Sequence, residues 1–384
     1  MKKVIGIIAE YNPFHNGHIY QIKKIKENYP NSIIIVCTSS SFTQRGELSI
    51  LNKWEKTKVS LLNGVDIVIE LPYVYSTQSS DTFAKYGVSL LEKFHINYLC
   101  FGSESNDTTK LLDAAKTQIN NIEFDNKVKF YMKEGYNYPT SLNNALKELI
   151  NYDIKEPNDL LAISYIKEII NNNYNIEVFN IKRTNSYHDL DLDNKIVSAS
   201  NIRNKLLENK NIKDKVPKET YDILKNKSLE NKYFEFLKYK IISETDLEKY
   251  VDVDEGLNVR IKKYINKSKS LDELIMNIKT KRYTYNRISR MLNHILCSFT
   301  KEENDKIKKL EYIRILGFNE NGRTYLNEIK DSIELPILNK YDTKKYKALE
   351  IEKRVTDIYS NIYDNIIDQE IKNKPIYIKN NLSK

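Results

Sequence analysis

The chain has 384 residues, of which 40% are hydrophobic and 29% charged, and it carries a formal net charge of +9. This length is enough for two domains with separate cores. No apolar run approaches the ~20 residues of a membrane helix, which argues against an integral membrane protein. Three isolated cysteines argue against a disulfide framework or a zinc site. Because a predicted strand begins near the first residue, there is no room for a signal peptide, and we expect a cytoplasmic protein.

The first predicted element is a buried strand at residues 4–9, VIGIIA, which has the apolar, β-branched composition of a parallel strand. An amphipathic helix is predicted from residue 19 by apolar residues at spacings of three and four. The turn between them contains His15, Gly17 and His18. In an open α/β sheet this junction binds ligands, and the free N–H groups of the helix favour a phosphate.

Each residue type in this turn has a conformational or chemical role. Pro13 stiffens the chain, and Gly17 allows the backbone to approach a phosphate or nucleobase closely. His15 and His18 are three residues apart, so their rings can face one ligand and donate hydrogen bonds to a transition state. The alternative is that one histidine caps the turn and the other packs against a neighbour.

Two further strands, at residues 32–37 and 65–72, flank a predicted helix at 53–62. This alternation favours parallel βαβ units. Arg45 follows the first of these strands, where it reaches either a ligand or an ordinary surface carboxylate. A strand near residues 97–104 ends at Gly102, a position where an adenosine could lie against the backbone.

Residues 105–151 are predicted to be a helical insertion without obvious chemistry, and a helix begins near Pro157. Asn158 is either its cap or a hydrogen-bonding partner for a nucleotide. A last strand at 176–181 leads to Arg183, a cation suited to ATP phosphates, and to His188, either a ligand contact or a structural residue. Ser198 and Ser200 then open a helix that carries Arg203.

Beyond residue 212 the alternation fades and Lys- and Glu-rich helical patterns dominate. We therefore expect a catalytic α/β domain at 1–212 and a basic, mainly helical domain at 213–384. Residues 279–290 interleave cations, among them Arg282, Arg287 and Arg290, with tyrosines, a combination suited to RNA or to a solvated helix face. The segment 316–323 is predicted to be turn-rich, either an RNA contact or an interhelical loop.

The string Asn12-Pro13-Phe14-His15-Asn16-Gly17-His18 resembles the HxGH signature of the nucleotidyltransferase superfamily. With the preceding strand it resembles most closely the tRNA(Met) cytidine acetate ligases. That resemblance implies a Rossmann-like domain with a parallel sheet, followed by a mainly helical, tRNA-binding domain. It also implies a two-step reaction, in which ATP activates acetate as acetyl-adenylate and N4 of the wobble cytidine of elongator tRNA(Met) then accepts the acetyl group. ATP and Mg²⁺ are the expected cofactors.

The resemblance also implies which residues act. We expect His15, His18, Arg183 and Arg203 to stabilise the charge that develops on the phosphates. The expected ATP-binding residues are Ile7, Ala9, Glu10, Tyr11, Asn12, Pro13, Phe14, His15, Asn16, Gly17, His18, Tyr20, Gly102, Asn158, Arg183, Ser198 and Ser200. No residue is expected to bind a metal directly, and none is identified as the base for acetyl transfer. Two alternatives remain open: an adenylyltransferase for a small phosphorylated metabolite, and a non-catalytic ATP-sensing RNA-binding protein.

Overall fold

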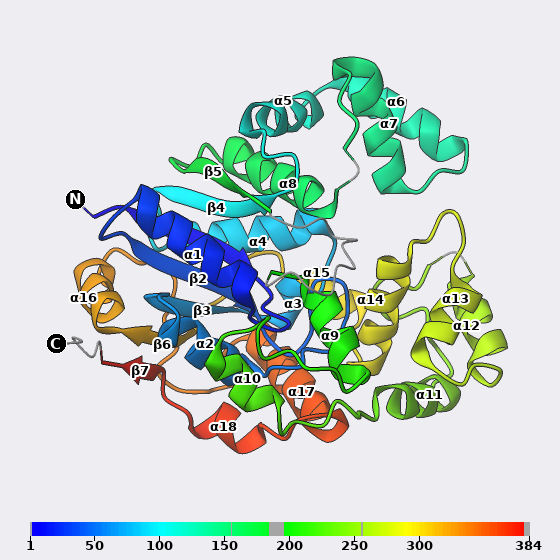
Figure 1. Cartoon of the computed structure of the whole chain (residues 1–384). Coiled ribbons are helices and arrows are strands. Elements are labelled where there is room, and N and C mark those ends of the chain that lie inside the picture. Colours follow the sequence, from blue (N-terminus) through cyan, green and yellow to red (C-terminus); the bar gives the residue numbers. More distant parts are fainter. Residues whose placement is uncertain (1, 155, 184–195, 255, 380–384) are drawn as a thin grey trace.

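A computed structural model describes residues 2–154, 156–183, 196–254 and 256–379. A seven-stranded sheet in the order β5-β4-β1-β2-β3-β6-β7 lies at its centre (Figure 1). Five of its strands are parallel and come from the first half of the chain: β1 (Val4–Ala9), β2 (Ile33–Ser39), β3 (Ile67–Leu71), β4 (Tyr98–Ser103) and β5 (Glu177–Lys182). The order reverses between β1 and β4, which is the topological switch point where such sheets bind ligands.

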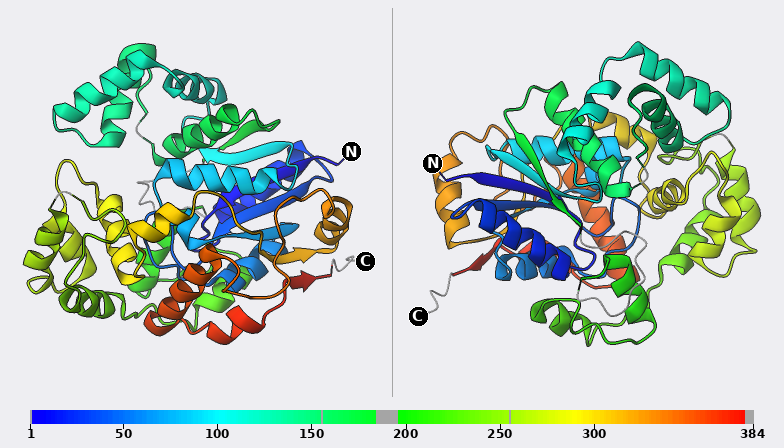
Figure 2. Two further views of the ribbon diagram at one scale, coloured as in Figure 1. Left: turned by 180° about the vertical axis from the view of Figure 1, so that it is seen from behind. Right: turned by 45° about the horizontal axis from the view of Figure 1, so that its top comes forward.

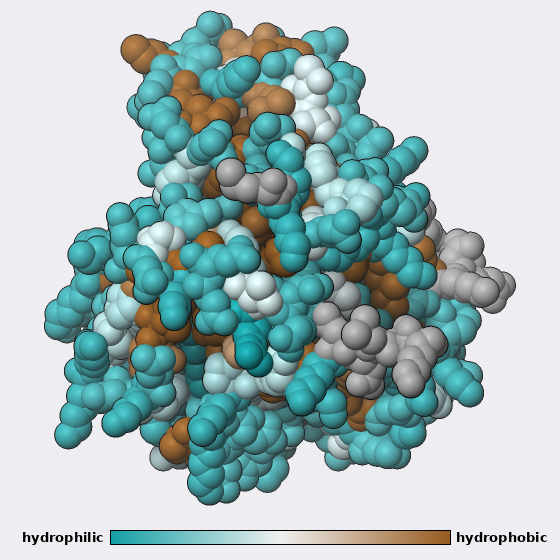
Figure 3. Space-filling view, turned by 90° about the vertical axis from the view of Figure 1, so that its left-hand side faces the viewer, coloured by the Kyte–Doolittle hydropathy of each residue, from teal (hydrophilic) through white to brown (hydrophobic). Residues whose placement is uncertain are grey.

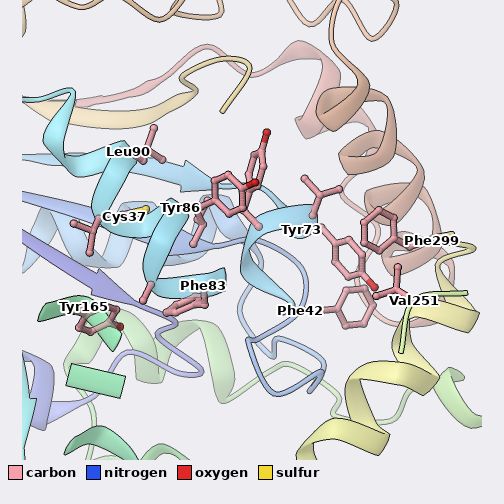
Figure 4. Packing of buried hydrophobic residues seen from close by; sticks show 14 of the residues in the cluster. Cys37, Phe42, Tyr73, Phe83, Tyr86, Leu90, Tyr165, Val251 and Phe299 are labelled. Carbon is pink, nitrogen blue, oxygen red and sulfur yellow. The ribbon is translucent and has the colours of Figure 1, made fainter. Parts of the chain in front are cut away.

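Helices cover both faces of the sheet because its strands are apolar on both sides. On one face Ile22 and Ile25 of α1 (Asn16–Asn28) and Trp54 and Val59 of α2 (Lys53–Leu62) pack together in one core cluster. On the other face lie α3 (Tyr73–Ser76), α4 (Ser80–Glu92) and α8 (Pro157–Asn171), and Figure 4 shows this core running from Cys37 through Phe83 toward Phe299. One continuous core therefore joins the parallel strands to the C-terminal half.

A helical insertion follows β4, as predicted. It consists of α5 (Thr108–Gln118), α6 (Ile122–Lys133) and α7 (Tyr138–Ile150), which form the lobe at the top of Figure 1. Figure 3 shows a mainly hydrophilic face with small hydrophobic areas, some of them at the top of this lobe. Among the described residues no helix is long and apolar enough to cross a membrane.

The second half of the chain is mainly helical, as expected. Its helices are α9 (Ala199–Leu207), α10 (Lys218–Leu224), α11 (Tyr233–Ser243), α12 (Leu257–Ile265), α13 (Leu271–Ile278), α14 (Tyr285–Leu296), α15 (Lys301–Lys306), α16 (Glu320–Ile329), α17 (Lys347–Ile362) and α18 (Ile367–Lys372). The division near residue 212 stays a prediction, and the sheet contains strands from both sides of that residue.

Two strands of the second half were not predicted. Strand β6 (Ile315–Asn319) pairs antiparallel with β3, and β7 (Ile376–Ile378) pairs parallel with β6. The prediction of a turn-rich segment at 316–323 was therefore wrong, since these residues form β6 and the start of α16. Gly317 is part of a strand and not of a turn. A Cβ at this position would come within 2.8 Å of the Ile376 carbonyl oxygen, so the glycine allows the two strands to pack closely.

A buried ionic cluster fixes the C-terminal helices to the sheet. The Lys53 ammonium lies 2.8 Å from Glu352 and 2.9 Å from Glu370, and it also contacts Glu70. Arg314 adds a second cation 2.6 Å from Glu370. Among the described residues, these three glutamates are the only set of three or more possible ligand residues that lie close enough together to hold a metal ion. Because Lys53 bonds to all three, the group is a structural ion cluster.

Candidate active site

A cavity of about 680 Å³ opens at the carboxyl ends of β1 and β4. This volume is within the usual range for sites that bind small molecules. Its walls come from the β1–α1 turn, the ends of β4 and β5, the start of α9 and the start of α14. The cavity therefore lies at the topological switch point and is bounded by both halves of the chain.

The two histidines of the turn lie together on one wall of this cavity. Their ring centroids are 3.8 Å apart. His15 is the N-cap of α1, and its Nδ1 accepts a hydrogen bond of 3.0 Å from the Gly17 N–H. The His15 N–H in turn donates to Nδ1 of His18 at 3.1 Å. His15 thus does cap the helix, as the alternative reading held, and both rings also line the cavity.

This hydrogen bonding determines which nitrogen of each ring carries a proton. Burial, and then the Arg183 cation, lowers the pKa of His15 to about 3. Burial, His15 and Arg183 together hold the pKa of His18 well below its usual value. Both rings are therefore neutral at pH 7. Because Nδ1 accepts a bond in each ring, the proton must be on Nε2, which leaves two neutral donors.

The local sequence explains why the histidines are held so closely. A Cβ at Gly17 would come within 2.8 Å of Cε1 of His15, so only glycine lets that ring lie on the helix start. Tyr11 is buried and has a left-handed φ of 46°, and its ring lies 4.6 Å from that of His18 and 4.8 Å from that of Phe14. A left-handed residue other than glycine at such a place is typical of a functional site.

A second wall is built around Gly102 at the end of β4. The Arg183 side chain passes over this glycine, where a Cβ would come within 3.2 Å of its Cγ. The same oxygen of Glu104 lies 3.4 Å from Nε of Arg183 and accepts a hydrogen bond from Nδ2 of Asn158. Burial raises the pKa of Glu104, whereas Asn158 and Arg183 oppose this rise. One carboxylate thus orients two residues that the sequence predicts to bind ATP.

The start of α9 supplies a third side. Ser198 caps the helix by accepting a hydrogen bond from the Asn201 N–H, and its hydroxyl lies 3.0 Å from that of Ser200. Arg203 donates to the Asn12 carbonyl and to Glu47, each at 2.7 Å. Its guanidinium therefore fixes the β1–α1 turn, a role that the sequence reasoning did not foresee.

Three comparisons with known proteins bear on this geometry. A family model described as HIGH Nucleotidyl Transferase matches residues 1–374. A protein from Caldicellulosiruptor saccharolyticus is 39% identical over 396 residues, covering 98% of this chain and 99% of its own length. One from Clostridium novyi is also 39% identical, over 402 residues, covering 98% and 100%. Both are named tRNA(Met) cytidine acetate ligase.

The chain belongs to this ligase family. The resemblance recognised in residues 12–18 is thereby confirmed. The solved structure of Thermotoga maritima TmcAL without ligand matches with a TM-score of 0.88 at 27% identity, covering 98% of this chain and 100% of that one. A second structure of the same enzyme, bound with alpha-thio ATP, matches with the same TM-score, identity and coverage. The nucleotidyltransferase fold predicted from the sequence is confirmed as well.

The structure brings most of the predicted site residues to the cavity wall. These are Ala9, Glu10, Tyr11, Asn12, His15, Gly17, His18, Tyr20, Gly102, Asn158, Arg183, Ser198, Ser200 and Arg203. Four others do not line it. Ile7 and Phe14 are buried in the core beneath the turn, Asn16 donates to the Asp214 carbonyl, and Pro13 is buried. His188 is outside the described residues.

A short loop at residues 43–47 connects this site to the C-terminal half. Its Gln44 N–H donates to Glu10, and its Glu47 pairs with Arg203. Gly46 has a φ of 82°, and a Cβ there would come within 2.8 Å of the α14 backbone at Arg290. The loop therefore seats α14 against the nucleotide-facing turn, and Arg282, Arg287 and Arg290 all line the cavity.

Proposed function

We propose that this protein activates acetate with ATP and transfers the acetyl group to N4 of the wobble cytidine in elongator tRNA(Met). The name of the relatives, tRNA(Met) cytidine acetate ligase, supports the substrates, and the alpha-thio ATP bound by a structural neighbour supports the nucleotide. The observation within this chain that carries the proposal is the pair of neutral histidines facing one cavity with Arg183. We place the reaction in the cytoplasm, where ATP and tRNA are available together.

In the first step an oxygen of acetate attacks the α-phosphorus of ATP, and the bond to pyrophosphate breaks. The Nε2–H groups of His15 and His18 would donate to the phosphate oxygens while Arg183 balances their charge. Neutral donors suit this step because they stabilise charge without transferring a proton. Acetate is already ionised at pH 7 and needs no base.

In the second step the cytidine amine attacks the acetyl carbonyl, AMP leaves and one proton is released. Arg287 and Arg290 of α14 line the same cavity as the histidines. They would hold the phosphates of an RNA strand next to the activated acetyl group. In this arrangement residues from both halves of the chain would act at one cavity.

We infer that Mg²⁺ enters with ATP as part of the substrate. Two carboxylates on the cavity wall already have partners, since Glu10 accepts a bond from Gln44 and Glu47 pairs with Arg203. Burial also raises the pKa of Glu10, which weakens it as a metal ligand. Mg²⁺ commonly keeps its waters and binds chiefly through substrate phosphates, which fits this wall.

Isotope exchange between ATP and pyrophosphate tests the first step. We expect exchange only when acetate is present, and its loss in His18→Ala. His95→Asn is the matched control, since His95 is exposed, has a left-handed φ of 51° that asparagine tolerates, and does not line the cavity. Exchange that requires a phosphorylated metabolite in place of acetate would contradict the proposal.

A further inference from the structure

The helical insertion reaches the active site. Asn137, Tyr138 and Pro139, at the start of α7, line the catalytic cavity. In Figure 1 and in both views of Figure 2 the α6–α7 hairpin lies on the same side of the sheet as α13 and α14. The turn of this hairpin therefore faces the loop that leads into α14.

A second cavity, of about 520 Å³, lies between these two segments. The hairpin contributes residues 134–137, and the loop and first residues of α14 contribute 279–281, 284 and 285. Asn137 and Thr284 line both cavities, so the second cavity is adjacent to the first. A hydrogen bond of 3.3 Å from Nδ2 of Asn137 to the Lys281 carbonyl joins the two segments. We call this second cavity the entry cleft.

The entry cleft combines exposed aromatic rings with cations. Tyr136 is 48% exposed, and Tyr138 beside the cleft is 47% exposed, although tyrosines are usually more buried. Lys279 and Lys281 are exposed on the facing loop, and Glu134 is the single carboxylate among the described residues of the cleft wall. Exposed aromatic rings beside cations allow bases to stack while phosphates are neutralised.

Contacts of Arg287 and Tyr285 stabilise the loop that forms one side of the entry cleft. Arg287 lies over the ring of the buried Tyr283, with 4.8 Å between Cζ and the ring centroid, and Arg287 also lines the catalytic cavity. The hydroxyl of Tyr285 donates to Asp272. Cations therefore line both the entry cleft and the catalytic cavity.

We propose that the α6–α7 hairpin is one jaw of an RNA-binding cleft and that residues 279–285 are the other. A single-stranded segment next to the target nucleotide lies in the entry cleft, with a base stacked on Tyr136, and the target base passes into the catalytic cavity. This inference rests on the proposed function. It assigns RNA contacts to an insertion that carries no nucleotide motif.

Steady-state kinetics with tRNA tests the cleft in the full-length protein. The variants are Tyr136→Ala and Lys281→Glu, with Tyr136→Phe as the conservative variant. Phe130→Ala is the matched control, because Phe130 is 58% exposed on the same hairpin and lines neither cavity. Since Tyr136→Ala removes the ring on which a base would stack, we expect it to raise KM for tRNA by roughly 10-fold.

The same measurements separate this inference from the proposed function. Acetate-dependent exchange should be unchanged in every variant, and Tyr136→Phe and Phe130→Ala should resemble the wild type with tRNA. A KM for tRNA unchanged by both Tyr136→Ala and Lys281→Glu would overturn the inference, even if acetylation proceeds. If the wild type lacks acetylation, direct titration with an anticodon stem–loop still tests the cleft, since both variants should weaken binding.

Discussion

The neutral state of His15 and His18 is a quantitative prediction of the site geometry. A histidine with the usual pKa of about 6.5 is roughly three-quarters protonated at pH 6. With a pKa of about 3, His15 would be protonated in about one molecule in a thousand at that pH. Its Nδ1 accepts a bond from the Gly17 N–H, so the proton of the neutral ring belongs on Nε2.

Nuclear magnetic resonance of the ring nitrogens measures this directly in the ligand-free protein. The chain has only five histidines, which single substitutions can assign. We expect the signals of His15 and His18 to be those of the Nε2–H tautomer and to stay constant between pH 8 and about 5. His95, which is exposed, provides the reference signal for a histidine outside the site. A titration of His15 or His18 with a midpoint near 6.5 would refute the reasoning.

The same pKa shift makes stability depend on pH. The folded-state pKa of His15 lies below the unfolded value of about 6.5, so unfolding takes up a proton between these two values. The contribution of His15 is therefore complete above pH ~6.5 and is lost as the pH falls, by about 1.4 kcal/mol per pH unit. His15→Asn should remove this dependence of the unfolding free energy on pH. The difference in unfolding free energy between the variant and the wild type should therefore change with pH.

Three further predictions concern residues that position the site. A double-mutant cycle of Arg203→Ala and Glu47→Ala should give a coupling of about 1 kcal/mol in unfolding free energy, because the pair is partly exposed; additive effects would contradict the pairing. Glu104→Gln should raise KM for ATP by about 3- to 10-fold with a smaller effect on kcat, because it weakens the contacts that position Asn158 and Arg183. An unchanged KM would contradict that role. Lys53→Met should lower the unfolding free energy by about 3–5 kcal/mol, because three buried carboxylates lose the ammonium group that they share. A midpoint of thermal unfolding equal to that of the wild type would contradict this.

The elements that the sequence predicts well are those whose cause is local. The strand at 4–9 and the helix at 53–62 follow from apolar composition and periodicity, and the structure has both with the same bounds. The histidine pair was found because strand, turn and helix are adjacent in the chain. Ser198 likewise caps its helix through a neighbour three residues away.

The relations that the sequence could not predict are non-local. Asn293 donates to the Gly46 carbonyl across 247 residues, and no periodicity encodes that contact. Glu104 was visible next to Gly102, but its role requires Asn158 and Arg183 to come from two other elements. Strands as short as β7 carry too few residues for an alternating pattern to emerge.

Nucleoside analysis of tRNA after incubation with the purified protein tests the central claim most directly. Unmodified elongator tRNA(Met) is supplied with ATP and acetate, and each is omitted in turn. We predict N4-acetylcytidine at the wobble position only when ATP and acetate are both present, and none with His18→Ala. Acetate-dependent pyrophosphate exchange without any acetylcytidine in the tRNA would contradict the account.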